Sequence, residues 1–201
     1  MQKNRPHQER PRDVDIRSAI EVLRQGGTIL YPTDTIWGLG CDARNADAVE
    51  RLYAIKQRDR SKSMLVLCTE NIISGRHDLF ELSGHPDSRP TTYILPAGIW
   101  QPLFGSPLAD NLAAADGSLG VRLVRHDFCR RVVDALGAPL VSTSANFSGQ
   151  PSPASHADIA PGLFTCVDYA VPPLAEFESH ETRGSRIVKF SPDGRQTVVR
   201  P

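Results

Sequence analysis

Short apolar runs of strand length alternate with stretches whose apolar residues recur at helical spacing, which restricts the chain to folds that mix strands and helices. Helices are expected at 16–23, 46–53 and 128–136. Strands are expected at 28–31, 64–68, 91–95, 119–124 and 140–143. Capping signals support the helices: Gly26-Gly27 follows the first, Asn45 or Asp47 starts the second, and Asp127 and Gly137 flank the third.

Two β-type runs close the chain, 186–190 and 196–200, and Ser191-Pro192-Asp193-Gly194 between them is a strong turn signal. With the mixed elements before it, this hairpin favours an α/β or α+β domain built on one twisted, mixed sheet flanked by helices. A chain of 201 residues suits a single domain, which we expect over 14–201. Residues 1–13 are polar and mildly basic, and we expect them to form a disordered tail.

The composition excludes several classes of protein. Lys plus Arg and Asp plus Glu both number 23, so an anion site must come from local clustering of charge. The four cysteines are far apart with no His at ligand spacing, which predicts reduced, mostly buried thiols in place of a zinc site or disulfides. No apolar stretch approaches the roughly 18 residues that cross a bilayer, and no secretory signal is recognisable, so a cytoplasmic protein is expected.

The segment 31–40, YPTDTIWGLG, is the most informative one for function. Thr33 and Thr35 place two hydroxyls on the same side of an extended backbone, while Asp34 faces away. Gly38 and Gly40 lack side chains where a backbone can approach a ligand. The alternative is an ordinary turn between two strands, for which Pro, Asp and Gly are common residues.

The segment 51–62 holds five basic residues and one acid. Lys56 and Arg58 lie at the end of the predicted helix, and Lys62 stands just before a predicted buried strand. Basic groups that converge at the mouth of an α/β sheet suit a polyphosphate or a nucleic-acid backbone. The alternative is a solvated helix end whose cations complement the helix dipole.

A third segment, 142–152, follows a predicted strand and offers small hydroxyl and amide side chains, as phosphate or ribose oxygens require. The Pro-rich stretch 150–161 after it is expected to be a surface loop with one helical turn. The alternative is a Ser-rich loop that bonds its own backbone. Neither a P-loop nor a GxSxG elbow is present, so an enzyme of this sequence would work by orientation and electrostatics, without a covalent nucleophile.

Taken in order, these segments resemble the YrdC-type family of threonylcarbamoyl-AMP synthases, from about Asp15 to Arg200. The resemblance is carried by YPTDTIWGLGCDA at 31–43, IKQRDRSKSM at 55–64, RPTTYILPA at 89–97, GVRL at 120–123 and STSANFSGQPSP at 142–153. It implies one α/β domain with a concave, basic surface. The implied reaction converts L-threonine, bicarbonate and ATP to threonylcarbamoyl-AMP and pyrophosphate, for modification of tRNA beside the anticodon.

The resemblance also implies a role for each matched residue. Lys56 and Arg58 would act in catalysis. Threonine or its carbamate would be held by Thr33, Thr35, Arg122, Ser142 and Ser185. ATP would be bound by Arg58, Lys62, Ser118, Ser144, Asn146, Ser152 and Arg200. Mg²⁺ would be coordinated by the ATP phosphates and mostly by water, so no protein side chain is expected to bind a metal.

The chain departs from the family's pattern at Asp59, Ser63, Arg89, Arg125 and Arg186, and it corresponds to the short form without an additional C-terminal domain. Two alternatives to the synthase remain open. One is an RNA-binding module of the same fold, and the other is a carbamoyl-adenylate synthase with a different amine acceptor. Expected partners are the proteins that transfer the threonylcarbamoyl group to tRNA, with weak binding of tRNA or double-stranded RNA.

Overall fold

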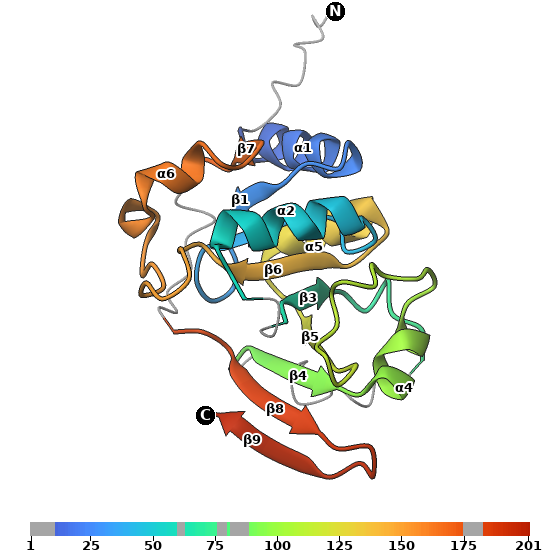
Figure 1. Ribbon diagram of the computed structural model, residues 1–201. Helices are drawn as coiled ribbons and strands as arrows, with labels where there is room; N and C mark the ends of the chain where they lie inside the picture. Colours follow the sequence, from blue (N-terminus) through green and yellow to red (C-terminus); the bar gives the residue numbers. More distant parts are fainter. Residues whose placement is uncertain (1–10, 60–62, 76–79, 81–88, 175–182) are drawn as a thin grey trace, which may run out of the picture.

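One mixed sheet runs through the molecule in the computed structural model, which describes residues 11–59, 63–75, 80, 89–174 and 183–201. Over these residues the sheet has nine strands in the order β7-β1-β2-β6-β3-β5-β4-β8-β9 (Figure 1). The strands are β1 (Ile29–Tyr31), β2 (Gly38–Gly40), β3 (Leu65–Cys68), β4 (Thr91–Leu95), β5 (Leu119–Leu123), β6 (Leu140–Ser144), β7 (Tyr169–Ala170), β8 (Arg186–Phe190) and β9 (Gln196–Arg200). The pairs β1–β7, β3–β5 and β4–β8 are parallel and the other pairs are antiparallel. The predicted mixed sheet is thus confirmed.

The helices pack on this sheet, and α1 and α5 also contact each other. The described helices are α1 (Pro11–Arg24), α2 (Ala46–Lys56), α4 (Ala97–Trp100), α5 (Asp127–Leu136) and α6 (Pro161–Phe164), with the 3₁₀ turns η2 (Gln101–Leu103) and η3 (His156–Asp158). Asn45 caps α2 by accepting the Ala48 N–H, and Gly137 ends α5 with a positive φ of 66°. Both caps confirm the sequence prediction.

Several boundaries differ from the prediction. Helix α1 begins at Pro11, five residues before the predicted start at Ile16, because proline suits a first helical turn and Asp13 pairs with Arg131 of α5 at 2.7 Å. Residues 11–13 of the predicted tail thus belong to α1, and residues 1–10 lie outside the described residues. Strand β2 was not among the predicted strands, because a strand of three residues shows no alternation of its own. The predicted loop at 150–161 does contain one 3₁₀ turn.

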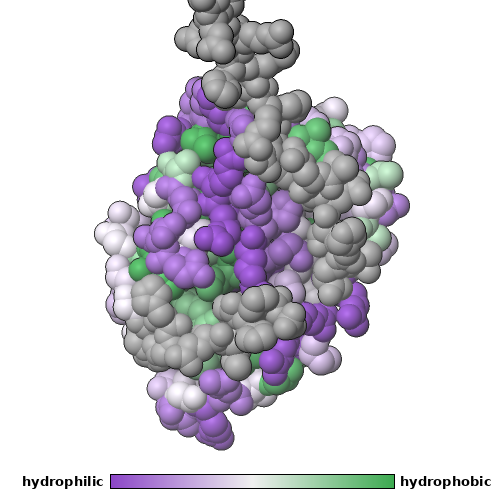
Figure 2. Space-filling model, turned by 180° about the vertical axis from the view of Figure 1, so that it is seen from behind, coloured by the Kyte–Doolittle hydropathy of each residue, from purple (hydrophilic) through white to green (hydrophobic). Residues whose placement is uncertain are grey.

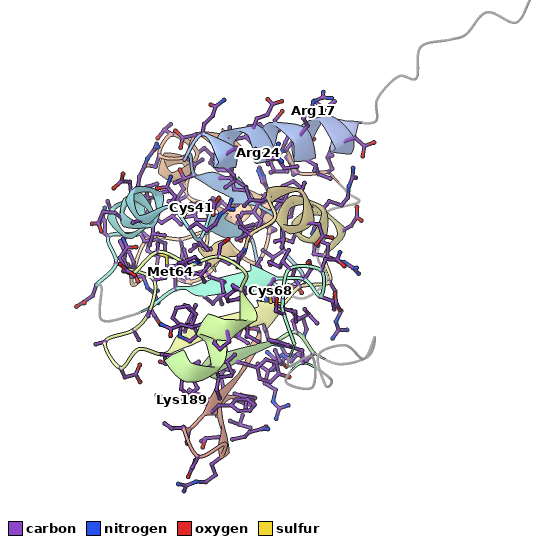
Figure 3. All side chains as sticks on the ribbon, turned by 90° about the vertical axis from the view of Figure 1, so that its right-hand side faces the viewer. Arg17, Arg24, Cys41, Met64, Cys68 and Lys189 are labelled. Carbon is purple, nitrogen blue, oxygen red and sulfur yellow. The ribbon has the colours of Figure 1, made fainter. Side chains whose placement is uncertain are left out.

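The core lies between the sheet and its helices. Tyr31 of β1 stacks on Phe128 of α5 with ring centroids 6.2 Å apart, and its hydroxyl donates to the Val141 carbonyl. All four cysteines are free, and Cys41, Cys68 and Cys129 are buried as predicted. Figure 3 shows Cys41 and Cys68 inside the fold, whereas Arg17 and Lys189 lie on its outside. Among the described helices, none is long and apolar enough to cross a membrane.

The surface is not uniform in character. Seen from behind, hydrophilic residues form a band down the middle of the molecule (Figure 2). The far end of the sheet is different, because β9 pairs on one side with β8 and all of its residues are exposed. The β8–β9 turn is closed by the Gly194 N–H, which donates to the Ser191 carbonyl at 2.9 Å. This predicted hairpin is therefore confirmed.

The close pairing of β2 generates the first prediction. An added Cβ at Gly40 would lie 2.3 Å from the Val141 carbonyl oxygen and 2.8 Å from Cε1 of Tyr31. We expect Gly40→Ala to lower the free energy of unfolding by about 1–3 kcal/mol in urea denaturation. Gly98→Ala in α4 is the matched control, because nothing lies within 4 Å of its added Cβ. Equal urea midpoints for the two variants would contradict this account.

Candidate active site

A cavity of about 310 Å³ opens where the strands of the sheet meet the loops that follow them. Strands β2, β3, β4, β5, β6, β8 and β9 all contribute residues to its wall. Its polar wall is made of hydroxyl and guanidinium groups, and its described lining residues include no Asp or Glu. Apolar side chains from Ile36, Met64, Leu65, Ile94 and Ile187 complete the wall. The cavity thus combines cations and hydroxyls with apolar surface.

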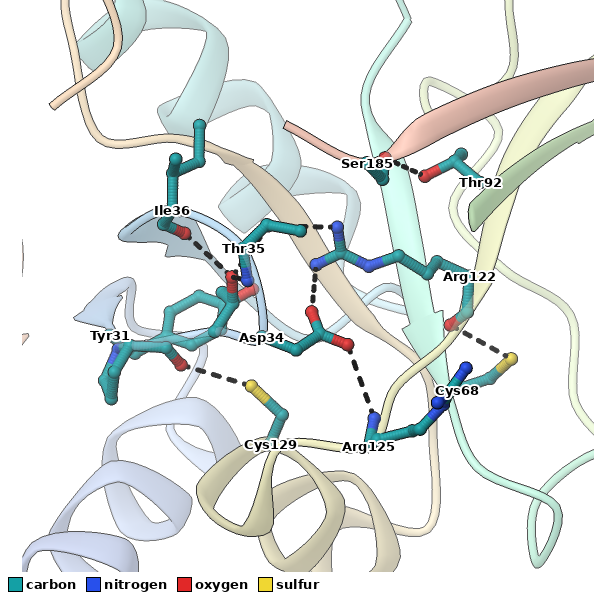
Figure 4. A network of polar contacts seen from close by, with 12 residues as sticks. Tyr31, Asp34, Thr35, Ile36, Cys68, Thr92, Arg122, Arg125, Cys129 and Ser185 are labelled. Carbon is teal, nitrogen blue, oxygen red and sulfur yellow. Dashed lines mark hydrogen bonds and ion pairs between the residues drawn. The ribbon is translucent and has the colours of Figure 1, made fainter. Parts of the chain in front are cut away.

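Thr33, Thr35 and Arg122 line this cavity, and Figure 4 shows Thr35 beside the Arg122 guanidinium. The Thr33 and Thr35 hydroxyls lie 3.1 Å apart, and Nη1 of Arg122 donates to Oγ1 of Thr35 at 3.2 Å. Nη2 of Arg122 pairs with Oδ1 of Asp34 at 3.1 Å. The Arg122 side chain is 4% exposed, so this ion pair is largely shielded from water. Asp34 therefore compensates a buried cation beside the two hydroxyls.

Arginines gather around the rest of the cavity. Arg58 donates to the Ser63 carbonyl at 3.0 Å, and burial lowers its pKa. Arg200 donates from Nε and Nη2 to the Ser185 carbonyl at 2.8 and 2.6 Å. Burial lowers the pKa of Arg200 as well, and the charges of Arg89 and Arg122 lower it further. Like charges held this close favour an anion between them.

Ser185 joins the β8 side of the cavity to β4. Its hydroxyl lies 2.7 Å from Oγ1 of Thr92, and both residues line the cavity. Arg89 holds the neighbouring backbone by donating from Nη2 to the Gly184 carbonyl at 3.0 Å. A Cβ at Gly184 would lie 2.9 Å from Nη2 of Arg200, so the absence of a side chain there lets the guanidinium lie against the backbone.

Lys56 lies behind the cavity wall. Its ammonium donates to the carbonyls of Ser144 and Asn146, both at 2.6 Å, and also contacts Oδ1 of Asn146 at 2.8 Å and Oγ of Ser144 at 3.3 Å. Lys56 is 1% exposed, and burial followed by the charge of Arg58 lowers its pKa to about 8. It therefore fixes the 144–146 loop.

The structure brings most of the sequence-predicted site residues into one cavity. Those that line it are Thr33, Thr35, Arg58, Arg122, Ser142, Ser144, Ser152, Ser185 and Arg200. Lys56 and Asn146 do not line it, and hold the loop beside it. Ser118 donates to Oδ1 of Asp116 at 2.6 Å and is likewise not part of the wall. The predicted Lys62 lies outside the described residues.

Some residues in or beside the cavity wall were not identified from the sequence. Thr92 lies inside the recognised stretch 89–97, but the alternation of β4 alone did not decide which of Thr91 and Thr92 faces the cavity. Arg89 was noted as a departure from the family pattern and given no role. Gly120 lies on β5 two residues before Arg122, and a Cβ there would lie 3.0 Å from Cβ of Leu65. The sequence feature that could have identified Gly120 is its place as the first residue of the recognised stretch GVRL at 120–123.

His, Cys, Asp and Glu are the side chains in the described part of the chain that could bind a metal ion. Within the described ranges, no three His, Cys, Asp or Glu side chains converge closely enough to hold a metal ion. The donor set of the cavity, guanidinium and hydroxyl groups, suits anions and amino-acid groups better than a bare cation.

Known proteins resemble this chain in sequence and fold. Residues 21–201 match the Sua5/YciO/YrdC family, described as telomere recombination. The threonylcarbamoyl-AMP synthase of Xanthomonas campestris pv. campestris is 36% identical over 166 residues, which cover 79% of this chain and 85% of that protein.

Two solved structures share the fold. P. abyssi Sua5 complexed with L-threonine has a TM-score of 0.69 and 22% identity, and the match covers 87% of this chain and 50% of that one. E. coli YciO has a TM-score of 0.70 and 23% identity, with 94% and 89% covered.

The buried ammonium of Lys56 generates the second prediction. Its pKa is about 8 in the folded chain and near 10.5 when unfolded. Between these values the unfolded chain binds more protons, so the Lys56 contribution to the free energy of unfolding rises with pH. We expect the wild type to gain stability over Lys56→Met at up to about 1.4 kcal/mol per pH unit in this window. Urea titrations from pH 7 to 10.5 would measure the difference, and parallel curves would contradict the shift.

Proposed function

This chain belongs to the Sua5/YciO/YrdC family, and we propose that it is an L-threonylcarbamoyladenylate synthase. The reaction joins L-threonine, bicarbonate and ATP to give threonylcarbamoyl-AMP, pyrophosphate and water. The observation that carries the proposal is one cavity lined by Arg122 and two threonines, which we assign to the amino-acid end, and by Arg58 and Arg200, which we assign to the phosphate end. An amino acid and a nucleotide polyphosphate each find matching groups there.

The amino-acid end is built for a carboxylate. A guanidinium can pair with a carboxylate through two parallel N–H donors, and Arg122 lines the cavity with its guanidinium held between Thr35 and Asp34. The hydroxyls of Ser142 and Ser185, which also line the cavity, can bond the remaining polar groups of the substrate. Arg122 therefore anchors the threonine beside the place where its nitrogen is carboxylated.

The phosphate end stabilises negative charge. The carbamate oxygen attacks the α-phosphorus of ATP, and the bond to pyrophosphate breaks. Charge grows on the α-phosphoryl oxygens and on the departing pyrophosphate, where Arg58 and Arg200 lie ready without rearrangement. Mg²⁺ would enter with ATP and neutralise part of the phosphate charge, held by phosphate oxygens and water. Ser144 and Ser152 offer hydroxyls to the nucleotide.

The apolar part of the wall protects the carbamate. A carbamate decomposes in water, so both half-reactions must take place in one shielded volume. The side chains of Ile36, Ile94 and Ile187 line the cavity next to the reacting groups. Lys56 acts from behind as a positioning residue, because its four oxygen contacts set the place of Ser144.

The product would serve proteins that transfer the threonylcarbamoyl group to tRNA beside the anticodon, with weak binding of tRNA or double-stranded RNA to the chain itself. We place the reaction in the cytoplasm, where tRNA, ATP and reduced thiols occur together. The four free cysteines support this location, because they show no disulfide that an oxidising compartment would favour.

The third prediction tests the reaction itself. Purified protein with ATP, Mg²⁺, bicarbonate and L-threonine is expected to release pyrophosphate, and mass spectrometry is expected to detect threonylcarbamoyl-AMP. Serine is expected to be accepted poorly and valine rejected most strongly, because a site that bonds the substrate hydroxyl leaves a buried group unpaired when the hydroxyl is missing. Equal pyrophosphate release with and without threonine would refute the proposal.

The fourth prediction tests the phosphate end. Arg58→Ala removes a preorganised donor, so we expect kcat/KM to fall about 100- to 1,000-fold in the same assay. Arg195→Ala is the control, because that arginine is 80% exposed in the β8–β9 turn, pairs with Asp193 and lies outside the cavity wall. A loss of less than threefold in Arg58→Ala would remove Arg58 from the assigned role.

A further inference from the structure

Two arginines from distant parts of the chain hold consecutive carbonyls at the point where the backbone enters β8. Nη2 of Arg89, two residues before β4, donates to the Gly184 carbonyl at 3.0 Å. Arg200 of β9 donates to the Ser185 carbonyl from Nε at 2.8 Å and from Nη2 at 2.6 Å. Both guanidiniums therefore lie against the same two residues of backbone.

Gly184 links the two guanidiniums. Its carbonyl accepts from Arg89, and a Cβ on it would lie 2.9 Å from Nη2 and 3.2 Å from Cζ of Arg200. Arg89 therefore fixes the residue against which the Arg200 guanidinium packs. Gly184, Ser185 and Arg200 line the cavity, whereas Arg89 does not. Any effect of Arg89 on the cavity thus passes through these neighbours or through its charge.

The charges of Arg89 and Arg200 are not balanced by a nearby acid. Within the described residues no carboxylate forms an ion pair with either of them, whereas Arg122 pairs with Asp34. Burial lowers the pKa of Arg200 most, and the charge of Arg89 lowers it next, so the two charges are close enough to repel each other. An anion in the cavity relieves this repulsion, and the gain grows with the negative charge that the anion carries.

We propose that Arg89 is a positioning residue for a polyphosphate anion: it fixes Gly184, on which Arg200 packs, and adds a positive charge that no acid neutralises. The inference rests on the proposed function, which supplies the polyphosphate as ATP and as the pyrophosphate that leaves. Arg89 is one of the departures from the family's pattern, so this contribution is a feature of this chain. Its role is to raise the affinity for phosphates without touching them.

Two ligands of different charge test the assignment by isothermal titration calorimetry without ATP. Inorganic pyrophosphate carries several negative charges, whereas L-threonine is a zwitterion without net charge at neutral pH. Arg89→Met removes both the charge and the donor to Gly184. We expect it to weaken pyrophosphate binding about tenfold and L-threonine binding less than threefold. Arg89→Lys keeps the charge and a donor, and is expected to bind both ligands within threefold of the wild type.

Arg195→Met is the matched control, because it removes the same single charge from a side chain that is 80% exposed and lies outside the cavity wall. We expect its pyrophosphate affinity to stay within twofold of the wild type. Urea midpoints show whether each variant is folded. If Arg89→Met does not fold, Arg89→Gln replaces it, because its amide can still donate a hydrogen bond while the charge is gone.

Equal weakening of pyrophosphate and L-threonine in Arg89→Met would overturn the inference, because Arg89 would then only support the backbone. A loss in Arg89→Lys as large as that in Arg89→Met would overturn it too, since the charge is retained there. Wild-type protein that binds no pyrophosphate would have the same consequence.

The proposed function is tested separately by turnover. If the wild type binds pyrophosphate in an Arg89-dependent way but releases no threonine-dependent pyrophosphate from ATP, the proposed function fails while the polyphosphate site stands. If threonine-dependent release occurs but Arg89→Met binds pyrophosphate as tightly as the wild type, the role of Arg89 is overturned and the proposed function stands. A tenfold loss confined to pyrophosphate and restored by lysine supports the inference.

Discussion

Positive charge buried inside the protein is the constraint around which this cavity is arranged. Arg122 lies on a central strand and is 3% exposed, and Lys56 is 1% exposed. Each charge needs oxygen atoms at hydrogen-bond distance to remain stable inside the protein. Arg122 finds them on Asp34 and Thr35, and Lys56 finds them on Ser144 and Asn146. The loops on either side of the cavity are therefore held by the cations they surround.

The sheet explains why residues so far apart in sequence can share this task. Strand β6 lies between β2 and β3, so the 142–146 segment stands beside both the Thr33–Gly38 segment and the start of β3. Strand β8 runs parallel to β4 and brings Ser185 to Thr92. A cavity lined by both halves of the sheet needs all of these pairings at once. The strand pairings therefore preorganise the groups that the sheet contributes to the cavity.

Local signals predicted much of this fold, and long-range partners explain what they could not. The caps at Asn45 and Gly137 and the 186–200 hairpin depend on neighbouring residues, and all were predictable. The seating of Lys56 depends on carbonyls about ninety residues away, so the charge pattern of 51–62 could not reveal that its ammonium faces inward. Ser118 was assigned to ATP binding from its position in the family motif, but its hydroxyl donates to Oδ1 of Asp116, two residues before it. The meeting of Thr33, Arg58 and Ser144 followed from the recognised order of segments and not from periodicity.

The hairpin β8–β9 contributes Arg200 to the cavity while being hydrogen-bonded to the rest of the sheet through β8 alone. The opposite wall comes from β5 and β6, which have neighbours on both sides. Edge elements open at a smaller free-energy cost than central ones. Among the described strands that line the cavity, the β8–β9 margin is therefore the part that we expect to open at the smallest free-energy cost. The cavity thus has one wall on an edge hairpin, β8–β9, and the opposite wall on central strands, β5 and β6.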